Sequence, residues 1–283
     1  MMPMLNADWL VPDWPAPPGV HAVFTTRAGG VSSAPWDSLN LGDHVGDVPA
    51  HVAANRGRLS AAVGAHAVFL QQVHGQAVCM LDAQTADGAV ADACVTQHIG
   101  VACTIMVADC LPVLLASTCG SFVGAAHAGW RGLAGTAPDS SGGVVESIYA
   151  SFTALARANI AGSASDLIAW LGPCIGPDAF EVGAEVKAAF KAVDPGAGAC
   201  FKAAGPGKFR ADLPALARLR LRALGVTDVY GNDGSAPWCT VSNPSRFFSH
   251  RRDAGPVRTD ESGGSGGNGF FTTGRMAACI WKG

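Results

Sequence analysis

Apolar residues are gathered along this chain into short runs separated by polar turns, a pattern typical of strands. Runs rich in Val, Ile and Phe predict strands at 19–27, 66–73, 77–81, 100–108, 112–117, 121–127 and 166–172. Two more strands are expected near the C-terminus, in "RFFSHRR" (246–252) and "GRMAACIWKG" (274–283).

Segments in which apolar residues recur at helical spacing lie between these strands at irregular intervals. It predicts helices at 49–64, 143–159, 181–193 and 211–225. The last of these is the most amphipathic, because leucines recur on one face with arginines between them. Strands that cluster in the middle of the chain, with helices placed irregularly, favour an α+β fold packed in layers over a strict βαβ alternation.

Segments rich in Gly, Ser, Asn and Asp predict loops. Residues 28–47 form one long ordered loop, and loops of this length inside a compact domain are usually functional. Residues 136–142 and 254–271 have the composition of inserted surface loops, and residues 1–19 that of an extended lead-in. We expect one domain over residues 1–283, since no linker divides the chain.

Composition narrows the function classes. Hydrophobic residues make up 49% of the 283 residues and charged residues 14%, which suits a heavily buried globule. A net charge of −3 without a basic run argues against a nucleic-acid partner. No apolar run reaches the roughly 20 residues that span a membrane. Nine scattered cysteines without a secretion signal predict reduced thiols and a cytoplasmic location.

Three of the predicted strands end in a side chain that can bind a metal: His74, Cys110 and His127. Imidazole and thiolate are good Zn²⁺ ligands, and three ligands with an open fourth position are typical of catalytic zinc. Copper accepts the same set. The gaps of 36 (110 − 74) and 17 (127 − 110) match no local metal motif. A hydrolase with Cys110 as nucleophile and His127 or His74 as base fits these residues equally well.

Seven motifs, in chain order, resemble the laccase-domain family. They are "FTTRAGGVSSAPWDSLNLGDHVGD", "QQVHG", "ADCLPVLL", "AHAGWRGLAG", "LGPCIG", "FEVGAEV" and "FFSHRRD" with "TGRMA". The family was first described as polyphenol oxidoreductases and is now understood as purine nucleoside phosphorylases. The resemblance implies a four-layer αββα sandwich, shared with toxin deamidases that use a Cys and a His. It also implies His74, Cys110 and His127 as metal ligands, with Zn²⁺ expected and Cu²⁺ as the alternative.

The same motifs suggest residues that contact substrate. Arg27 in "FTTR" matches a pocket arginine of the family, and its fork of donors suits phosphate, although a structural salt bridge is an equal alternative. Asn40 could bond a purine or ribose edge or stabilise its own loop. Gln72 and Arg131 flank ligand positions and could reach substrate, or could serve as a strand contact and a surface residue.

Several other polar residues near these motifs have weaker indications. Arg251, Arg252 and Arg275 border the second inserted loop, where they could bind an anion or form a solvated surface. None of the spare histidines His44, His98 and His250 is expected to be a ligand.

The resemblance implies an enzyme that cleaves adenosine, inosine and methylthioadenosine with inorganic phosphate. The products would be a free base and ribose or methylthioribose 1-phosphate, and a secondary adenosine deaminase activity is expected. Three alternatives stay open: a copper-dependent polyphenol oxidoreductase, a Cys–His hydrolase or amidase acting on cell-wall precursors, and a metal-binding module without activity. A multicopper oxidase is disfavoured because none of the eight histidines is paired as HxH.

Overall fold

The computed structural model describes residues 5–136, 142–158, 166–256 and 270–283. The α-helices are α1 (Pro49–Val63), α2 (Trp130–Ala134), α3 (Val144–Ala158), α4 (Ala184–Val193), α5 (Leu213–Ala223) and α6 (His250–Asp253). Two 3₁₀ turns are η1 (Pro195–Cys200) and η2 (Ala236–Trp238). The expected inserted loops, 136–142 and 254–271, lie for the most part outside the described residues. None of the helices in the described ranges is both long and apolar enough to cross a membrane.

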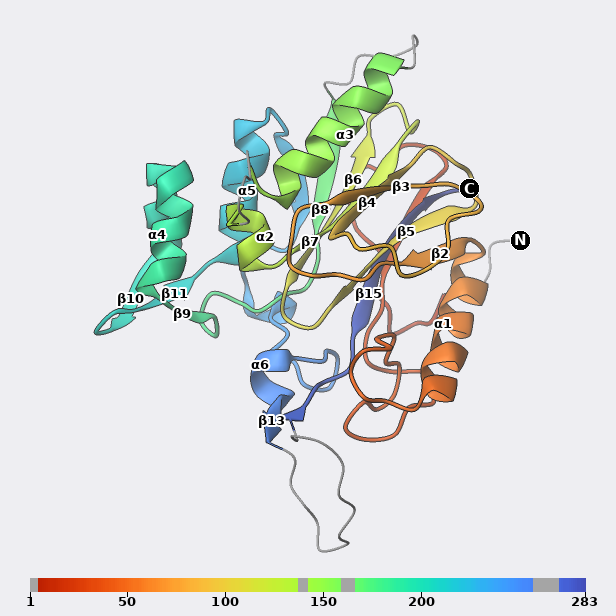
Figure 1. The fold of residues 1–283 in the computed structure, drawn as a ribbon, viewed down its shortest axis with the longest axis horizontal. Helices are drawn as coiled ribbons and strands as arrows, with labels where there is room; N and C mark the ends of the chain where they lie inside the picture. Colours follow the sequence, from red (N-terminus) through yellow and green to blue (C-terminus); the bar gives the residue numbers. More distant parts are fainter. Residues whose placement is uncertain (1–4, 137–141, 159–165, 257–269) are drawn as a thin grey trace, which may run out of the picture.

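Two sheets lie face to face in the middle of the molecule (Figure 1). The larger has the order β12 (Asp228–Gly231), β8 (Leu167–Leu171), β6 (Leu111–Ser117), β7 (Val123–Ala128), β4 (Ala93–Thr96) and β3 (Val78–Leu81). The smaller has the order β1 (Val20–Phe24), β15 (Met276–Lys282), β5 (Val101–Val107) and β2 (His66–Phe69).

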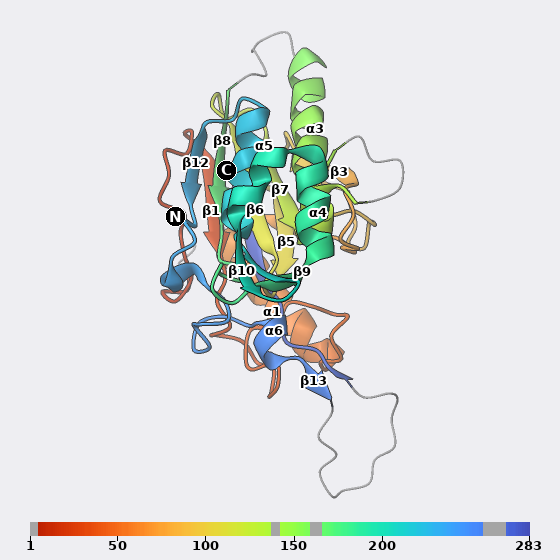
Figure 2. The same cartoon turned by 90° about the vertical axis from the view of Figure 1, so that its left-hand side faces the viewer.

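Two small sheets accompany them. One has the order β10 (Phe201–Gly205), β11 (Lys208–Ala211) and β9 (Glu181–Gly183), and the other pairs β13 (Gly255–Pro256) with β14 (Phe270–Phe271). The three-stranded sheet lies beside α4 (Figure 2).

Strand alternation divides the apolar side chains between the layers. On β6, Leu114 points into the space between the two sheets, where it joins Phe24, Ile105 and Trp170. Its neighbour Val113 points to the opposite face of the same sheet. Every residue of β5, β6 and β7 is buried, because each of these strands is covered on both faces.

Helices cover the outer face of each sheet. Ile148 and Phe152 of α3 pack with Leu216 of α5 on the six-stranded sheet. On the other side, Leu59 of α1 packs against the four-stranded sheet. Figure 1 shows α1 on one side of the two sheets and α3 and α5 on the other. The order helices, sheet, sheet, helix confirms the α+β, four-layer αββα sandwich.

Two expected elements were wrong. The predicted helix 181–193 begins with strand β9, whose register is fixed by pairing with β11, and α4 starts only after the extended residue Gly183. The predicted strand 246–252 is a turn followed by α6, because the Ser249 side chain accepts a hydrogen bond from the Arg252 amide and so caps the helix. Short strands β4 and β10 to β12 were not predicted.

Candidate active site

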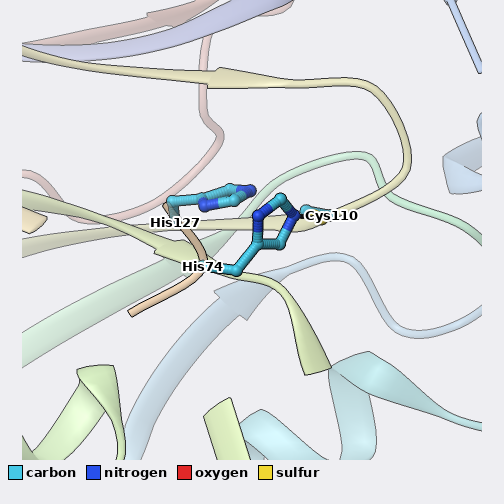
Figure 3. A group of neighbouring side chains, drawn as sticks. All are labelled: His74, Cys110 and His127. Carbon is cyan, nitrogen blue, oxygen red and sulfur yellow. Dashed lines mark hydrogen bonds between the residues drawn. The ribbon is translucent and has the colours of Figure 1, made fainter. Parts of the chain in front are cut away.

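The loop after β2, the turn before β6 and strand β7 bring His74, Cys110 and His127 together (Figure 3). The predicted strand 66–73 ends already at Phe69, so His74 lies in a loop and not at a strand end. The ligating atoms of the three residues all lie within 4.8 Å of one another, and Cys110 Sγ is 3.6 Å from His74 Nε2. The register of β6 on β7 explains part of this convergence, because Pro112 pairs with His127 and Cys110 directly precedes β6. His127 is buried, Cys110 half-buried and His74 exposed, so the cluster has one face open to solvent.

A carboxylate behind the cluster holds two of its three members. Asp92, fully buried, accepts a hydrogen bond from His127 at 2.8 Å from Nδ1 to Oδ1. It also accepts from the backbone amides of Val73, His74 and Gly75, at 3.2, 2.9 and 2.7 Å. Binding through Nδ1 leaves His127 Nε2 as the atom that faces a ligand, which is the arrangement that orients metal-binding histidines.

The backbone at the cluster is unusual. His74 and Asp109 both have positive φ, 60° and 88°, a conformation that non-glycine residues rarely adopt. A side chain at Gly129 would collide with the cluster, since a Cβ there would lie 2.8 Å from His74 Cδ2 and 3.1 Å from Cys110 Sγ. Backbone held in such sparsely populated conformations is commonly found at functional sites.

Cys110 and His127 favour their charged forms in the metal-free protein. Burial opposes the Cys110 thiolate, but the charge and hydrogen bonds of His127 and His74 outweigh it and lower the pKa of Cys110 to about 6. Burial likewise opposes protonation of His127, but Cys110 and Asp92 raise its pKa to about 9. Between these two pH values the pair is a thiolate beside an imidazolium.

The donor set fits a metal ion. One thiolate and two imidazoles are soft and borderline ligands that suit Zn²⁺ or copper, and the ligating atoms already converge. An open face beside three ligands leaves room for a further ligand such as a substrate atom.

The open face of the cluster adjoins a cavity of about 270 Å³, close to the lower end of the range for small-molecule sites. Its lining residues are His44, Gln72, His74, Met106, Val107, Ala108, Asp109, Cys110, His127, Trp130, Ile175, Phe180, Leu213, His250, Arg251 and Arg275. The lining combines an apolar part with two arginines and two further imidazoles, so it can hold a flat apolar ring and an anion together.

Two residues expected to contact substrate lie elsewhere. Arg27 is not in the cavity lining: its guanidinium donates to the Asp37 carbonyl and carboxylate and to the Pro244 carbonyl, and stacks on Phe248. Its observed contacts are therefore those of the structural alternative.

Asn40 is fully buried, and its side chain bonds Gly42, Asp47 and the Arg275 amide. These bonds tie the long loop to the start of the last strand, so Asn40 supports residues that line the cavity without lining it.

Gln72 and Arg131 differ in their placement. Gln72 lines the cavity, but its amide is already bonded to both the Met106 amide and the Met106 carbonyl, each at 2.8 Å. Arg131 is exposed and lies over the Trp130 ring, outside the lining residues.

Sequence reasoning missed the contributions of Asp92, His44 and His250, and gave only a weak indication for Arg275. Asp92 directly precedes β4, a strand too short to be recognised from the sequence, so no pattern indicates its role. His44, His250 and Arg275 come from segments far apart in the chain, and only the fold places them in one cavity. The position of Arg251 and Arg275 beside the second inserted loop is the available sequence signal, and it indicates either anion binding or a solvated surface.

Comparison with known proteins places these features in a family. The family of multi-copper polyphenol oxidoreductase laccases matches residues 21–283. A purine nucleoside phosphorylase of Pseudomonas aeruginosa is 45% identical over 278 residues, covering 98% of this chain and 99% of its own. The purine nucleoside phosphorylase YfiH of Escherichia coli is 44% identical over 274 residues, covering 96% and 98%.

Two solved structures have the same fold. A protein of Neisseria meningitidis superposes with a TM-score of 0.79 at 42% identity, covering 97% of this chain and 99% of its own. YlmD from Geobacillus stearothermophilus superposes with a TM-score of 0.80 at 31% identity, covering 99% and 98%.

Proposed function

We propose that this chain, which belongs to the family of laccase-like, multi-copper polyphenol oxidoreductases, is a purine nucleoside phosphorylase. Its proposed reaction is the cleavage of adenosine, inosine and methylthioadenosine with inorganic phosphate. The observation that carries the proposal is the cavity, in which the His–Cys–His cluster, an apolar wall and cationic side chains meet. The names of the relatives in P. aeruginosa and E. coli support the same activity.

The reaction joins an anion to a developing cation. A phosphate oxygen forms a bond to C1′ of the ribose while the bond from C1′ to the purine nitrogen breaks. The electron pair of that bond leaves with the base, which then takes up a proton. An enzyme accelerates this step by holding phosphate and nucleoside in line and by stabilising the charge on the departing base.

The lining residues suit these tasks. Trp130, Phe180 and Ile175 offer apolar surface for a purine ring or a methylthio group. Arg275 and Arg251 offer donors for phosphate. His74, Cys110 and His127 would hold Zn²⁺, with Cu²⁺ as the alternative, and a bound metal would supply a Lewis acid that polarises a substrate oxygen or nitrogen.

The proposal has finer parts. A secondary deamination of adenosine at C6 is included, because the same cavity would hold that ring beside the cluster. We also propose that the protein is cytoplasmic and that residues 1–283 form a single domain. Purine nucleosides and phosphate are the proposed partners, without nucleic acid or membrane.

The thiolate–imidazolium pair favours a second candidate, a Cys–His hydrolase or amidase. Cys110 would attack a carbonyl carbon, and His127, oriented by Asp92, would donate a proton to the leaving group. Cell-wall precursors remain the proposed substrates of this alternative.

A copper-dependent polyphenol oxidoreductase has less support. Among the described residues, His74, Cys110 and His127 make up the group of three ligating side chains that converge. Four-electron reduction of oxygen by multicopper enzymes requires several copper ions, and one His₂Cys group binds one.

Replacement of Cys110 separates the two leading functions. In Cys110→Ser and Cys110→Ala, metal content and phosphate-dependent release of adenine from adenosine should fall together, since each change removes the soft thiolate. The matched control Cys79→Ser alters a thiol outside the cavity lining and should retain both.

The opposite pattern would contradict the phosphorylase. It would consist of full metal occupancy in Cys110→Ala, together with rapid alkylation of Cys110 in the wild type that substrate prevents. That outcome would support the hydrolase.

A further inference from the structure

We propose that Arg275, together with His44 and His250, forms the subsite that binds inorganic phosphate in the cavity. The inference rests on the proposed function and adds to it the residues that hold the attacking anion. All three residues line the cavity. Arg27, the arginine that its motif suggests for phosphate, does not line it.

Arg275 is held rigidly with part of its guanidinium free. Its backbone amide donates to Asn40 Oδ1 at 2.9 Å, and Nη1 donates to the Thr273 carbonyl at 2.7 Å. Its aliphatic stem packs on Gly42, where a Cβ would lie 2.7 Å from Arg275 Cγ. Within the described residues, Nε and Nη2 have no hydrogen-bond partner. Those two groups are the parallel donors that a guanidinium offers to a phosphate.

His44 and His250 add donors near the same charge. Both imidazoles line the same cavity as the Arg275 side chain. Burial lowers the pKa of each, and the charge of Arg275 lowers it further, although Asp43, 3.4 Å from His44 Nδ1, acts in the opposite direction on His44. A neutral imidazole presents one N–H donor and adds no repulsion for a neighbouring arginine. An arginine that shares a cavity with two neutral donors can bind a phosphate oxyanion without bringing three positive charges together.

Two carboxylates beside this subsite are already engaged. Asp43 Oδ1 lies 3.4 Å from His44 Nδ1, and Asp43 Oδ2 pairs with Arg56 at 3.2 Å. Asp109 accepts hydrogen bonds from the Thr240 hydroxyl at 2.5 Å and from the Arg251 amide at 2.6 Å, so both of its oxygens are occupied. Arg251 also lines the cavity, and its guanidinium donates to the Glu181 carbonyl at 3.2 Å. We therefore assign Arg275 the contact with phosphate and Arg251 a supporting charge.

The same chemistry could recognise a phosphate carried by another molecule, such as the 5′-phosphate of a nucleotide. Inorganic phosphate is favoured because the cavity of about 270 Å³ must also hold the nucleoside that reacts with it. A nucleotide in the nucleoside position would place its own phosphate where the attacking one must lie.

The test measures phosphate binding both directly, by calorimetry, and through the KM for phosphate in turnover. Arg275→Gln should raise the KM for phosphate by roughly tenfold or more, the effect of losing a charge-assisted hydrogen bond. Its KM for inosine and its metal content should change little. Gly42→Ala, which displaces Arg275 without removing a charge, should raise the KM for phosphate as well. Titration calorimetry with phosphate alone should show the same weakening of binding in both variants.

Controls keep the outcomes distinct. Arg222→Gln removes an exposed arginine outside the lining, and Gly57→Ala adds a Cβ where no atom lies within 4 Å, so both should behave as the wild type. Folding of each variant is checked by thermal melting. Adenosine monophosphate should compete weakly with phosphate, and strong competition would reassign the subsite to a nucleotide phosphate.

The results that would contradict the phosphate subsite differ from those that would contradict the phosphorylase activity. Unchanged phosphate KM and unchanged calorimetric binding in both Arg275→Gln and Gly42→Ala would overturn the subsite and leave phosphorolysis intact. A wild type that binds phosphate through Arg275 but releases no base would overturn the proposed function and leave the anion site in place.

Discussion

Asp92 links two of the three clustered side chains through a single carboxylate. Oδ1 serves His127 and the His74 amide, and Oδ2 serves the amides on either side of His74. The hydrogen bonds lower the pKa of Asp92 although burial opposes the charged form, so it stays ionised beside the cluster.

Asp92→Asn should therefore weaken metal binding by about 10- to 100-fold, the usual effect of losing the group that orients a ligand histidine. An amide has only one acceptor oxygen, so either His127 or the amides of the His74 loop lose their partner. Metal affinity measured by chelator competition checks this, with the exposed Asp8→Asn as control. Equal affinities in the variant and the wild type would show that Asp92 has no part in positioning the ligands.

The thiol of Cys110 gives a pH-dependent prediction. Because its pKa is lowered to about 6, the thiolate forms as pH rises through 6. In chelator-treated protein, its alkylation rate should increase from pH 5 to pH 7 and then level off. Cys79, whose pKa burial raises, should react only at higher pH and serves as an internal control.

Zn²⁺ should suppress the Cys110 reaction at every pH, because a metal-bound thiolate is less available. Residue-specific mass spectrometry measures the alkylation of Cys110 and of Cys79 in one sample. A half-maximal rate near the ordinary cysteine value of about 8.5 would contradict the charged pair.

At the scale of elements, the junction of β7 and α2 sets the spacing of the cluster. His127 lies in β7, and Gly129 is the extended residue before α2. The contact of a Cβ at Gly129 with both His74 and Cys110 means that this junction tolerates only glycine while the cluster keeps its geometry.

Gly129→Ala should lose most bound metal and most activity, because the added methyl forces His74 or Cys110 to move. Gly57→Ala, in the exposed middle of α1, should keep both and stabilise the fold by about 0.5–1 kcal/mol through helix propensity. Metal content and thermal melting compare the pair. Full metal occupancy in Gly129→Ala would show that the cluster is not so tightly constrained.

The elements that could be predicted from the sequence are those whose local pattern and tertiary environment agree. Helix 49–64 was predicted because Pro49 and Gly64 mark its ends, and strands such as 112–117 because both faces are buried and apolar. The pattern failed at Phe247 and Phe248, which are adjacent and both fully buried. Two apolar neighbours suggest a strand, yet here a turn points both rings into the core.

At the scale of the molecule, the αββα arrangement assembles the site from distant segments. The cluster could be predicted because each of its three residues lies at or close after the end of a recognisable apolar run. The rest of the cavity could not, since His44 and His250 carry no local signal, Arg275 carries only the weak one of an arginine beside an inserted loop, and the three meet only after the layers pack. Arg27 had the chemistry expected of a phosphate ligand, but Asp37 and Pro244 occupy its donors.

Product identity tests the central claim most directly. Adenosine is incubated with protein of measured metal content, with and without inorganic phosphate, and every product is quantified. The account predicts equal amounts of adenine and ribose 1-phosphate, formed only when phosphate is present and in proportion to bound metal. Release of adenine with free ribose at the same rate without phosphate, or no adenine release from fully metal-loaded protein, would contradict it.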